Sequence, residues 1–492
     1  MRILLINSIP YYVKQKAALP LGLLSIATHL FQKGHEVRIY DRAVEGGSVK
    51  KHVKSFLPDL VGVSSLGIMS FSDAVKVSKT VKEFDLPVVW GGHVPGLIPE
   101  TVLKTGVVDY VITREGEHTI EALLEALAGK GSLGEIEGLA YLENGVFCEN
   151  APRKDIDLKD LPILDYSFVD PEKYFWRSME YERMLHVYSS KGCVGRCTYC
   201  YSPGYCKEIW RPRPVSYFIE ELKYLKENHS IDGFYFADDL FAPNVKRVDE
   251  VCDALLESGL NLVWSTDMRT DICTRPMLEK MHKAGCRALF FGVESGSTVR
   301  QKAIKKKLDA DKTRETMEIC KEIGVWATAS YVIGFPDEDE EELRQTLDLI
   351  KTINSDVSIV SLYGPMPASE MFNDLVESGK MAYPETFKDW EKLAIIDKVG
   401  NNYSKIPVLE LKVISNFYLL SILVEKKGTK SEKNVSKAWA KRLVSLARDI
   451  AGRRNFRAFA LLFLSAKEFL ELLYYALCFP GIRKKYGLKY RR

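Results

Sequence analysis

The chain has 492 residues and a mass of 55.8 kDa, longer than one compact domain, so we expect two domains with appended segments. Apolar residues make up 46% of the sequence and charged residues 27%, which excludes the disordered, collagenous and low-complexity classes. The net charge is only +3, yet residues 431–492 hold 15 lysines and arginines against four acidic residues, so the basic character lies at the C-terminal end.

Residues 1–130 predict a doubly wound, Rossmann-like α/β domain. Short apolar runs without alternation are typical of parallel strands covered on both faces, and segments with helical periodicity separate them. The predicted strands are Ile3–Ile6, Glu36–Tyr40, Leu60–Val63, Pro87–Trp90 and Tyr110–Ile112. The predicted helices are Leu19–Lys33, Ser70–Phe84, Ile98–Thr105 and His118–Ala128.

Polar or glycine-rich residues follow the ends of these strands. Ligands of parallel sheets bind in the crevice beyond the carboxyl ends of the strands, so this edge is the expected binding site. The candidate residues there are Ser64, Ser65, Gly91, Gly92, Glu115 and Gly116. His93 follows the double glycine, and a single histidine in such a loop is more typical of packing or hydrogen bonding than of metal binding.

Residues 131–184 predict a connector that contains a small hairpin. Residues 185–390 predict a partial (β/α)6 barrel, because strand and helix alternate six times, and the chemistry of barrels lies at the carboxyl ends of their strands. The predicted barrel strands are Leu185–Ser189, Gly233–Phe236, Leu262–Ser265, Ala288–Gly292, Ala327–Ile333 and Val357–Ser361. Residues 391–492 predict a helical, basic C-terminal region.

Three cysteines follow the first barrel strand at a Cys-x3-Cys-x2-Cys spacing: Cys193, Cys197 and Cys200. Three thiolates on a four-iron cluster leave one iron without a protein ligand, and a substrate or cofactor can bind there. The alternative is a zinc-stabilised binding protein in which Cys206 or His186 is the fourth ligand. Zinc sites usually consist of two ligand pairs separated by a longer gap, and no second Cys-x2-Cys occurs here, so the spacing favours the cluster.

With an aromatic residue before the third cysteine, the chain resembles the radical S-adenosylmethionine (SAM) enzymes. Polar segments after the later strands also resemble those of this family, in which they hold the amino group, ribose, carboxylate and adenine of SAM. The resemblance assigns SAM contacts to Tyr199, Asp238, Asp239, Arg269, Glu294, Ser295, Tyr331 and Gly334.

The resemblance implies a radical reaction. In this family a reduced 4Fe-4S cluster passes one electron to the sulfonium of SAM, which cleaves to methionine and a 5′-deoxyadenosyl radical. That radical abstracts hydrogen from an unactivated carbon, while the barrel positions the substrate and excludes water and oxygen. An electron donor such as flavodoxin or ferredoxin is implied as a partner. Since this chemistry demands no acid/base pair, no catalytic side chain is assigned.

The first domain resembles the cobalamin (B12)-binding domain that precedes the barrel in one class of radical SAM enzymes. The subgroup includes hopanoid methylases and the anaerobic magnesium-protoporphyrin IX monomethyl ester cyclase. The resemblance implies that cobalamin binds at the strand-end residues named above. The Asp-x-His-x-x-Gly motif that supplies an axial histidine in other cobalamin proteins is absent, as is usual in this class. The alternative is a domain that keeps the fold without binding cobalamin.

Two outcomes are common in the class that the chain resembles. One is transfer of a methyl group from methylcobalamin to an unactivated carbon of a small-molecule or lipid substrate, with SAM used twice. The other is radical oxidation or ring formation without methyl transfer. The motifs do not separate the two, and we expect a B12-dependent C-methyltransferase because methyl transfer is the commoner outcome.

The basic residues of 431–492 are interleaved with apolar runs. Such a segment can lie on an anionic membrane and bring the enzyme to a lipid-like substrate. A helical cap on the barrel with a solvated charged face is the alternative, and no recognition motif for nucleic acid accompanies the charge. The start of the chain lacks the features of a secretory signal, so we expect a cytoplasmic protein with peripheral membrane contact.

Overall fold

The computed structural model describes residues 1–10, 17–306, 308–394, 402–425 and 481–488. The chain forms two compact units, which are described in turn. The first unit comprises Met1–Met268, Ile272–Leu289 and Gly364–Lys398. The second unit comprises Arg269–Asp271, Phe290–Tyr363 and Val399–Arg492.

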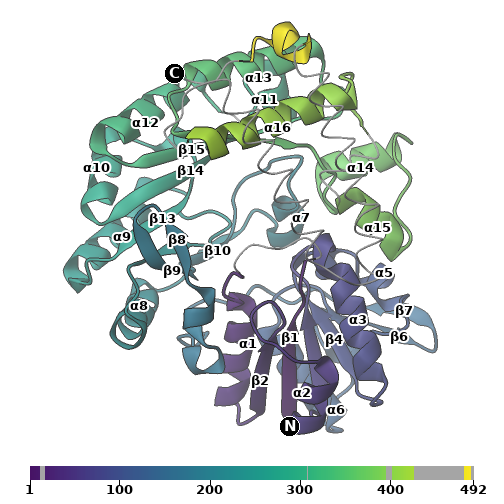
Figure 1. The fold of residues 1–492 in the computed structure, drawn as a ribbon. Helices are drawn as coiled ribbons and strands as arrows, with labels where there is room; N and C mark the ends of the chain where they lie inside the picture. The colour runs from purple at the N-terminus through teal and green to yellow at the C-terminus, as the bar shows by residue number, and fades with distance from the viewer. Residues whose placement is uncertain (11–16, 307, 395–401, 426–480, 489–492) are drawn as a thin grey trace, which may run out of the picture. The chain divides into compact units, whose positions relative to one another are not determined.

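The first unit begins with a seven-stranded sheet of order β2-β1-β3-β4-β5-β6-β7 (Figure 1). Its strands are β1 (Arg2–Asn7), β2 (Glu36–Asp41), β3 (Leu60–Ser64), β4 (Val88–Gly91), β5 (Tyr110–Ile112), β6 (Leu139–Glu143) and β7 (Val146–Glu149). The first five are parallel, as predicted, whereas β6 and β7 are antiparallel. The hairpin expected in the connector therefore extends the first sheet at β5.

Helices cover both faces of this sheet, because the strands are apolar on both sides. Residues Ile3–Ile6 of β1, for example, are all buried. Helices α1 (Leu21–Gln32) and α6 (Glu117–Leu127) contact each other, as do α2 (Val49–Phe56) and α3 (Phe71–Lys82). The doubly wound prediction is confirmed, and the crevice between β1 and β3, where the strand order reverses, is the expected ligand site.

Helix α2 was not predicted, because it is short and rich in lysine. Its buried face is Val49, Val53 and Phe56, spaced at one-turn intervals. The side chain of Ser48 caps its N-terminus by accepting a hydrogen bond from the Lys51 N–H. Two further short helices, α4 and α5, follow β4 at His93–Leu97 and Pro99–Leu103.

The second sheet has the strand order β16-β15-β14-β13-β12-β9-β8. The first unit holds β8 (Trp176–Ser178), β9 (Tyr181–Val187), β12 (Gly233–Phe236), β13 (Val263–Met268) and the start of β14 (Cys286–Glu294). Strands β9, β12 and β13 are parallel, and β8 adds an antiparallel edge that was not predicted. Helices α8 (Val215–His229), α9 (Val245–Ser258) and α10 (Arg275–Lys283) pack in series beside them.

A small ribbon follows the first barrel strand. Strands β10 (Ser190–Gly192) and β11 (Trp210–Pro212) pair antiparallel, and the short helix α7 (Ser202–Cys206) lies between them in the chain. The loop between β10 and α7 carries the three cysteines of the motif.

The first unit ends with α14 (Glu370–Glu377) and α15 (Phe387–Ala394).

The second unit contains the end of β14 together with the parallel strands β15 (Trp326–Ile333) and β16 (Val357–Leu362). Its helices are α11 (Thr298–Ala303), α12 (Ala310–Ile323), α13 (Glu340–Thr352) and α16 (Val408–Glu425). All six predicted barrel strands are therefore confirmed.

The described part of the C-terminal region contains the end of α15, the helix α16 and a short helix at residues 481–486, whereas residues 402–407 form a loop. The membrane contact predicted for residues 431–492 concerns a segment that lies mostly outside the described residues. No helix in the described part of the chain is both long and apolar enough to span a bilayer.

Candidate functional site

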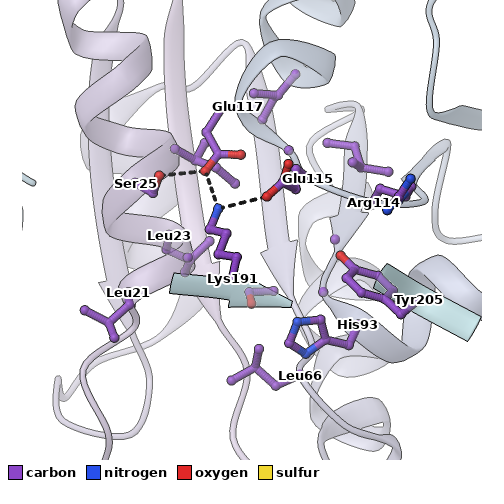
Figure 2. A pocket seen from close by; sticks show the side chains of 18 of the residues that line it. Leu21, Leu23, Ser25, Leu66, His93, Arg114, Glu115, Glu117, Lys191 and Tyr205 are labelled. Atoms are coloured by element: carbon purple, nitrogen blue, oxygen red, sulfur yellow. Dashed lines mark hydrogen bonds and ion pairs between the residues drawn. The ribbon is translucent and has the colours of Figure 1, made fainter. Parts of the chain in front are cut away.

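A pocket of about 270 Å³ opens at the carboxyl ends of the strands of the first sheet (Figure 2). Ser64 at the end of β3, Gly91 at the end of β4 and Ile112 at the end of β5 line it. Residues of α1 and α6 form one wall, and the ribbon strand β10 adds Lys191. The pocket therefore occupies the crevice that the strand order predicts.

Five of the six candidate residues of the first sheet line this pocket: Ser64, Gly91, Gly92, Glu115 and Gly116. The sixth, Ser65, is fully buried below the lining, where its hydroxyl is 2.7 Å from the hydroxyl of Ser70.

The two glycines after β4 have different roles. A Cβ atom at Gly91 would meet nothing within 4 Å, and the same holds for Gly22 of α1 on the pocket wall. These positions let a ligand approach the backbone closely. Gly92, in contrast, has φ +117°, and a Cβ there would lie 2.3 Å from the carbonyl oxygen of Ser65. Gly92 thus allows the loops after β3 and β4 to touch.

The pocket wall contains a network of ion pairs centred on Lys191 (Figure 2). The Lys191 ammonium lies 3.3 Å from a carboxylate oxygen of Glu115 and 3.2 Å from one of Glu117. The hydroxyl of Ser25 on α1 donates a hydrogen bond of 2.6 Å to Glu117. The network joins α1, the start of α6 and β10 in one wall.

Glu115 has further partners that hold it ionised. The Arg211 guanidinium donates two hydrogen bonds of 2.9 Å to it, and the Ile156 N–H donates a third of 3.0 Å. Burial alone would raise the pKa of Glu115, but Lys191 and Arg211 outweigh it and bring the pKa to about 2. Sequence reasoning missed Lys191 and Arg211; the one available signal was that Lys191 lies two residues before the first cysteine.

The three cysteines lie in the loop between β10 and α7, half-buried and without disulfides. The Gly195 N–H points at the Cys193 sulfur at 3.3 Å, and the Ser202 N–H at the Cys200 sulfur at 3.4 Å. Backbone N–H groups stabilise the thiolate form, which is the form that binds metals. The loop therefore has the donors that a metal centre requires.

The spacing of the thiols bears on the choice between zinc and a cluster. The ligand atoms of one tetrahedral zinc ion lie about 3 to 4 Å apart. Among the described residues, the group of histidine, cysteine and acidic side chains that could hold a single ion is His29, His118 and Glu121. In a four-iron cluster each thiolate binds a different iron, so the three thiols need not converge on one ion.

Cys206 and His186 are the two candidates for the fourth ligand of the zinc alternative. The Cys206 thiol is buried and donates to the Ser202 carbonyl at 2.9 Å. His186 lies within β9, where its ring stacks on Trp176 with 5.7 Å between centroids and burial lowers its pKa to about 4. The Cys206 thiol is thus engaged locally, whereas the buried Nδ1 atom of His186 has no hydrogen-bond partner among the described residues.

Asp238 and Asp239 follow β12 and face the ribbon. Asp238 is buried and accepts hydrogen bonds from the Ser189 N–H, the Ser189 hydroxyl and the Ser190 hydroxyl, at 2.6 to 3.0 Å. Burial raises the pKa of Asp238 to about 7 despite these bonds. Asp239 lines the pocket and accepts a 3.0 Å hydrogen bond from the Gly192 N–H, next to the first cysteine.

His93 lines the pocket and packs against two aromatic rings, those of Tyr201 at the start of α7 and Tyr205 within it. Its ring is edge-on to Tyr205, with 4.8 Å between centroids, and the Tyr201 hydroxyl is 3.5 Å from its Nδ1. Burial lowers the pKa of His93, which favours the neutral ring. These contacts agree with the packing role expected from the sequence.

The residues assigned to SAM are divided between the units. Tyr199, Asp238 and Asp239 belong to the first unit, and the other five belong to the second. Glu294 is the last residue of β14 and has φ +68°; its Oε1 atom forms an ion pair with Lys306 Nζ at 3.2 Å.

Within the second unit the remaining candidates have local roles. The Ser295 hydroxyl is 2.9 Å from that of Thr346, and the Gly334 N–H donates to the buried carboxylate of Glu338. Tyr331 is fully buried in β15, and Arg269 forms an ion pair with Asp271. Their assignment to SAM stays a prediction.

Two family models match the chain. The Radical SAM superfamily model matches residues 187–350, and the B12 binding domain model matches residues 16–124. The first range contains the three cysteines, and the second contains most of the pocket residues of the first sheet.

Curated relatives extend over most of the chain. An uncharacterized methyltransferase of Pyrococcus horikoshii is 28% identical over 410 residues, which are 81% of this chain and 88% of that protein. The anaerobic magnesium-protoporphyrin IX monomethyl ester cyclase of Synechocystis sp. is 25% identical and covers 74% of each chain. The similarity thus spans both predicted domains.

A solved structure has the same fold. The radical S-adenosylmethionine methyltransferase TsrM from Kitasatospora setae aligns with a TM-score of 0.65 at 19% identity, over 77% of this chain and 76% of that one. At this identity the likeness concerns the fold alone, and it agrees with a doubly wound domain followed by a partial barrel.

Proposed function

Because the chain is a radical SAM enzyme that carries a B12-binding domain, we propose that it transfers a methyl group to an unactivated carbon. Its cofactors are a 4Fe-4S cluster, SAM and cobalamin. The observation that carries the proposal is Lys191, because this one residue lines the pocket of the first sheet and lies two positions before the first cysteine. The methyl carrier and the cluster would thus be held by adjacent parts of one unit.

The pocket suits a corrinoid in its chemistry. Cobalamin is broad, apolar at its ring and rich in amide side chains at its rim. The backbone at Gly22 and Gly91 is open to close approach, while Leu21 and Leu23 offer apolar contact (Figure 2). The described lining therefore offers open backbone and apolar side chains to this cofactor.

The cysteine loop suits the cluster. We assign Cys193, Cys197 and Cys200 as its ligands, with the N–H groups of Gly195 and Ser202 stabilising the thiolates. When bound, the cluster and SAM supply the radical that removes hydrogen, and cobalamin supplies the methyl group. The protein's own part is to hold these groups and to exclude water. We propose that Asp238 or Asp239 accepts the ammonium of SAM.

A second candidate function is radical ring formation or oxidation without methyl transfer. The observation that favours it is the similarity to a protein named a cyclase. Methyl transfer is preferred because the relative that is 28% identical over 410 residues is named a methyltransferase.

The substrate that we propose is lipid-like, and the support is the basic, apolar sequence of residues 431–492. Full-length protein and a chain ending near residue 430 can be compared by flotation with anionic liposomes. We expect only the full-length protein to float. If neither protein floats, the proposal of a lipid-like substrate is rejected in favour of a water-soluble small molecule.

The deciding experiment is purification without oxygen after growth with hydroxocobalamin and iron. We expect about four irons and one corrinoid per chain. Incubation with SAM and a reductant should give 5′-deoxyadenosine together with S-adenosylhomocysteine, the second product marking use of SAM as a methyl donor. Formation of 5′-deoxyadenosine alone would favour the cyclase reaction, and zinc without iron would exclude both.

A further inference from the structure

A trio of side chains outside the pocket has the composition of a transition-metal site. His29 lies on α1, and His118 and Glu121 lie on α6. Their ligand atoms all lie within 4.8 Å of one another, which is true of no other trio of this kind in the described part of the chain. Two imidazoles and one carboxylate are a ligand set that zinc takes in proteins.

The geometry is close to that of a bound ion. The Glu121 Oε2 atom lies 2.8 Å from His29 Nε2 and 3.7 Å from His118 Nδ1. The two imidazole rings are 4.9 Å apart and nearly perpendicular, so they do not stack. Zinc bonds of about 2.0 to 2.1 Å in a tetrahedron place ligand atoms about 3.3 Å apart. The two separations from Glu121 Oε2, 2.8 and 3.7 Å, fall on both sides of that value.

The surroundings of Glu121 also suit a metal ligand. The Lys33 ammonium lies 2.9 Å from Glu121 Oε1, which leaves Oε2 directed at the two histidines. Carboxylates that bind metals are commonly oriented by such a second partner. His29 is buried at 5% exposure, whereas His118 and Glu121 are half-exposed. An ion and a water ligand can therefore reach the trio from solvent.

We propose that His29, His118 and Glu121 bind one divalent transition-metal ion of the zinc type, with water as the fourth ligand. The ion would tie α1 to α6. Ser25 lies one turn before His29 on α1, and Glu117 lies one turn before Glu121 on α6. Since the Ser25–Glu117 hydrogen bond belongs to the pocket wall, the ion would fix the spacing of the two helices that form this wall.

The test uses the full chain with its cluster assembled first, so that iron occupies the cysteines. Zinc is then titrated in competition with a chromophoric chelator. We expect one zinc per chain, with nitrogen and oxygen neighbours at about 2.0 to 2.1 Å and no sulfur at about 2.3 Å in zinc X-ray absorption. His118→Ala and Glu121→Gln should each weaken zinc binding at least ten-fold.

His52→Ala is the matched control, because His52 is another half-exposed histidine of the same domain, on α2. It should keep the affinity of the unaltered chain. Zinc should raise the thermal midpoint of the unaltered chain and of His52→Ala but not of His118→Ala. Zinc bound through sulfur, no zinc bound, or equal affinity in His118→Ala and the unaltered chain would each overturn the site. None of these outcomes depends on whether the enzyme transfers methyl groups.

Discussion

The pocket wall and the cysteine loop meet in the chain at β10, where Lys191 lies two residues before Cys193, but they hold their charges differently. In the wall, Lys191 lies within 3.3 Å of the carboxylates of Glu115 and Glu117, and Arg211 lies 2.9 Å from that of Glu115. In the loop, sulfur atoms accept backbone N–H groups, and the loop's cation Arg196 is paired with Glu208 at 2.5 Å. The wall balances its charges within the protein, so its shape should persist without a ligand. The loop should depend on the ions that it binds.

The largest expected effect comes from breaking the loop. Cys197→Ala leaves two thiolates for the proposed cluster, and a cluster held by two thiolates would not persist. We expect loss of iron and complete loss of 5′-deoxyadenosine formation, measured by iron analysis and chromatography of the reaction with SAM. The same loss is expected for Cys193→Ala and Cys200→Ala.

Cys206→Ala is the matched control for the loop, because its thiol lies nearby but is bonded to the Ser202 carbonyl. We expect it to keep iron and to cleave SAM. Retention of iron and activity in Cys197→Ala would refute the ligand assignment, and loss of metal in Cys206→Ala would revive the four-ligand zinc alternative.

Two buried carboxyl groups sharpen the comparison, because their pKa values move in opposite directions. Glu115 has two cations beside it and a pKa of about 2, whereas Asp238 has hydroxyl and N–H partners and a pKa of about 7. Glu115 therefore stabilises the fold above its unfolded pKa of about 4.3, and this contribution is lost as pH falls toward 2. Asp238 behaves oppositely: the free energy of unfolding should fall as pH rises from about 4 to 7.

The variant Asp238→Asn tests this difference. A pKa shift of about three units corresponds to as much as about 4 kcal/mol between pH 4 and pH 7. Removing the ionisable group should flatten the stability curve over that range, as measured by denaturant unfolding at several pH values. An unchanged slope in Asp238→Asn would mean that another group produces it.

The wall is broken by removing its central cation. Lys191→Met leaves Glu115 and Glu117 without the shared ammonium, and loss of one partner of a largely buried ion pair costs about 2 to 4 kcal/mol. We expect that loss in the free energy of unfolding, together with weaker binding of cobalamin in a spectral titration.

Two controls separate this effect from a general loss of charge. Lys104→Met removes an exposed ion pair with Glu100, which is worth less than about 1 kcal/mol, so its stability should barely change. Adding Glu117→Gln to Lys191→Met should recover part of the loss, because it removes one of the uncompensated charges. An equal loss in Lys104→Met and Lys191→Met would contradict a specific role for the wall.

The difference between wall and loop also explains what could be predicted from the sequence. The cysteines lie within eight consecutive residues, so their spacing alone predicts a metal site, and the composition of the apolar runs predicts the strands. The ion pairs of the wall join residues 74 to 96 positions apart, as in Lys191–Glu117 and Arg211–Glu115. Such pairs depend on how the sheet places its strand ends, so no local sequence pattern predicts them.

Local patterns also failed where backbone and packing compete for one residue. Ser64 and Ser65 both follow the predicted strand Leu60–Val63, but successive residues of an extended chain point to opposite sides, and Ser65 turns inward to Ser70. Helix α2 was not predicted because it is short and rich in lysine, with only three of its eight residues buried. In both cases the deciding contact comes from a different element.

The smallest expected effect compares Gly91→Ala with Gly92→Ala. A methyl group at Gly92 would strain a backbone with φ +117° and meet the Ser65 carbonyl at 2.3 Å, so we expect a loss of about 2 kcal/mol in the free energy of unfolding. A methyl group at Gly91 would enter the pocket without a clash, so stability should change by less than about 0.5 kcal/mol.

The same two variants, Gly91→Ala and Gly92→Ala, separate the stability of the pocket from its binding of cobalamin. If the pocket binds a corrinoid against the backbone at Gly91, then Gly91→Ala should weaken cobalamin binding at unchanged stability, because the added methyl occupies space that the ligand needs. Gly92→Ala should instead lower the denaturation midpoint first, and lower the affinity only through the displaced loop. Unchanged affinity in Gly91→Ala would move the corrinoid away from the end of β4, while the iron content of both variants should stay normal.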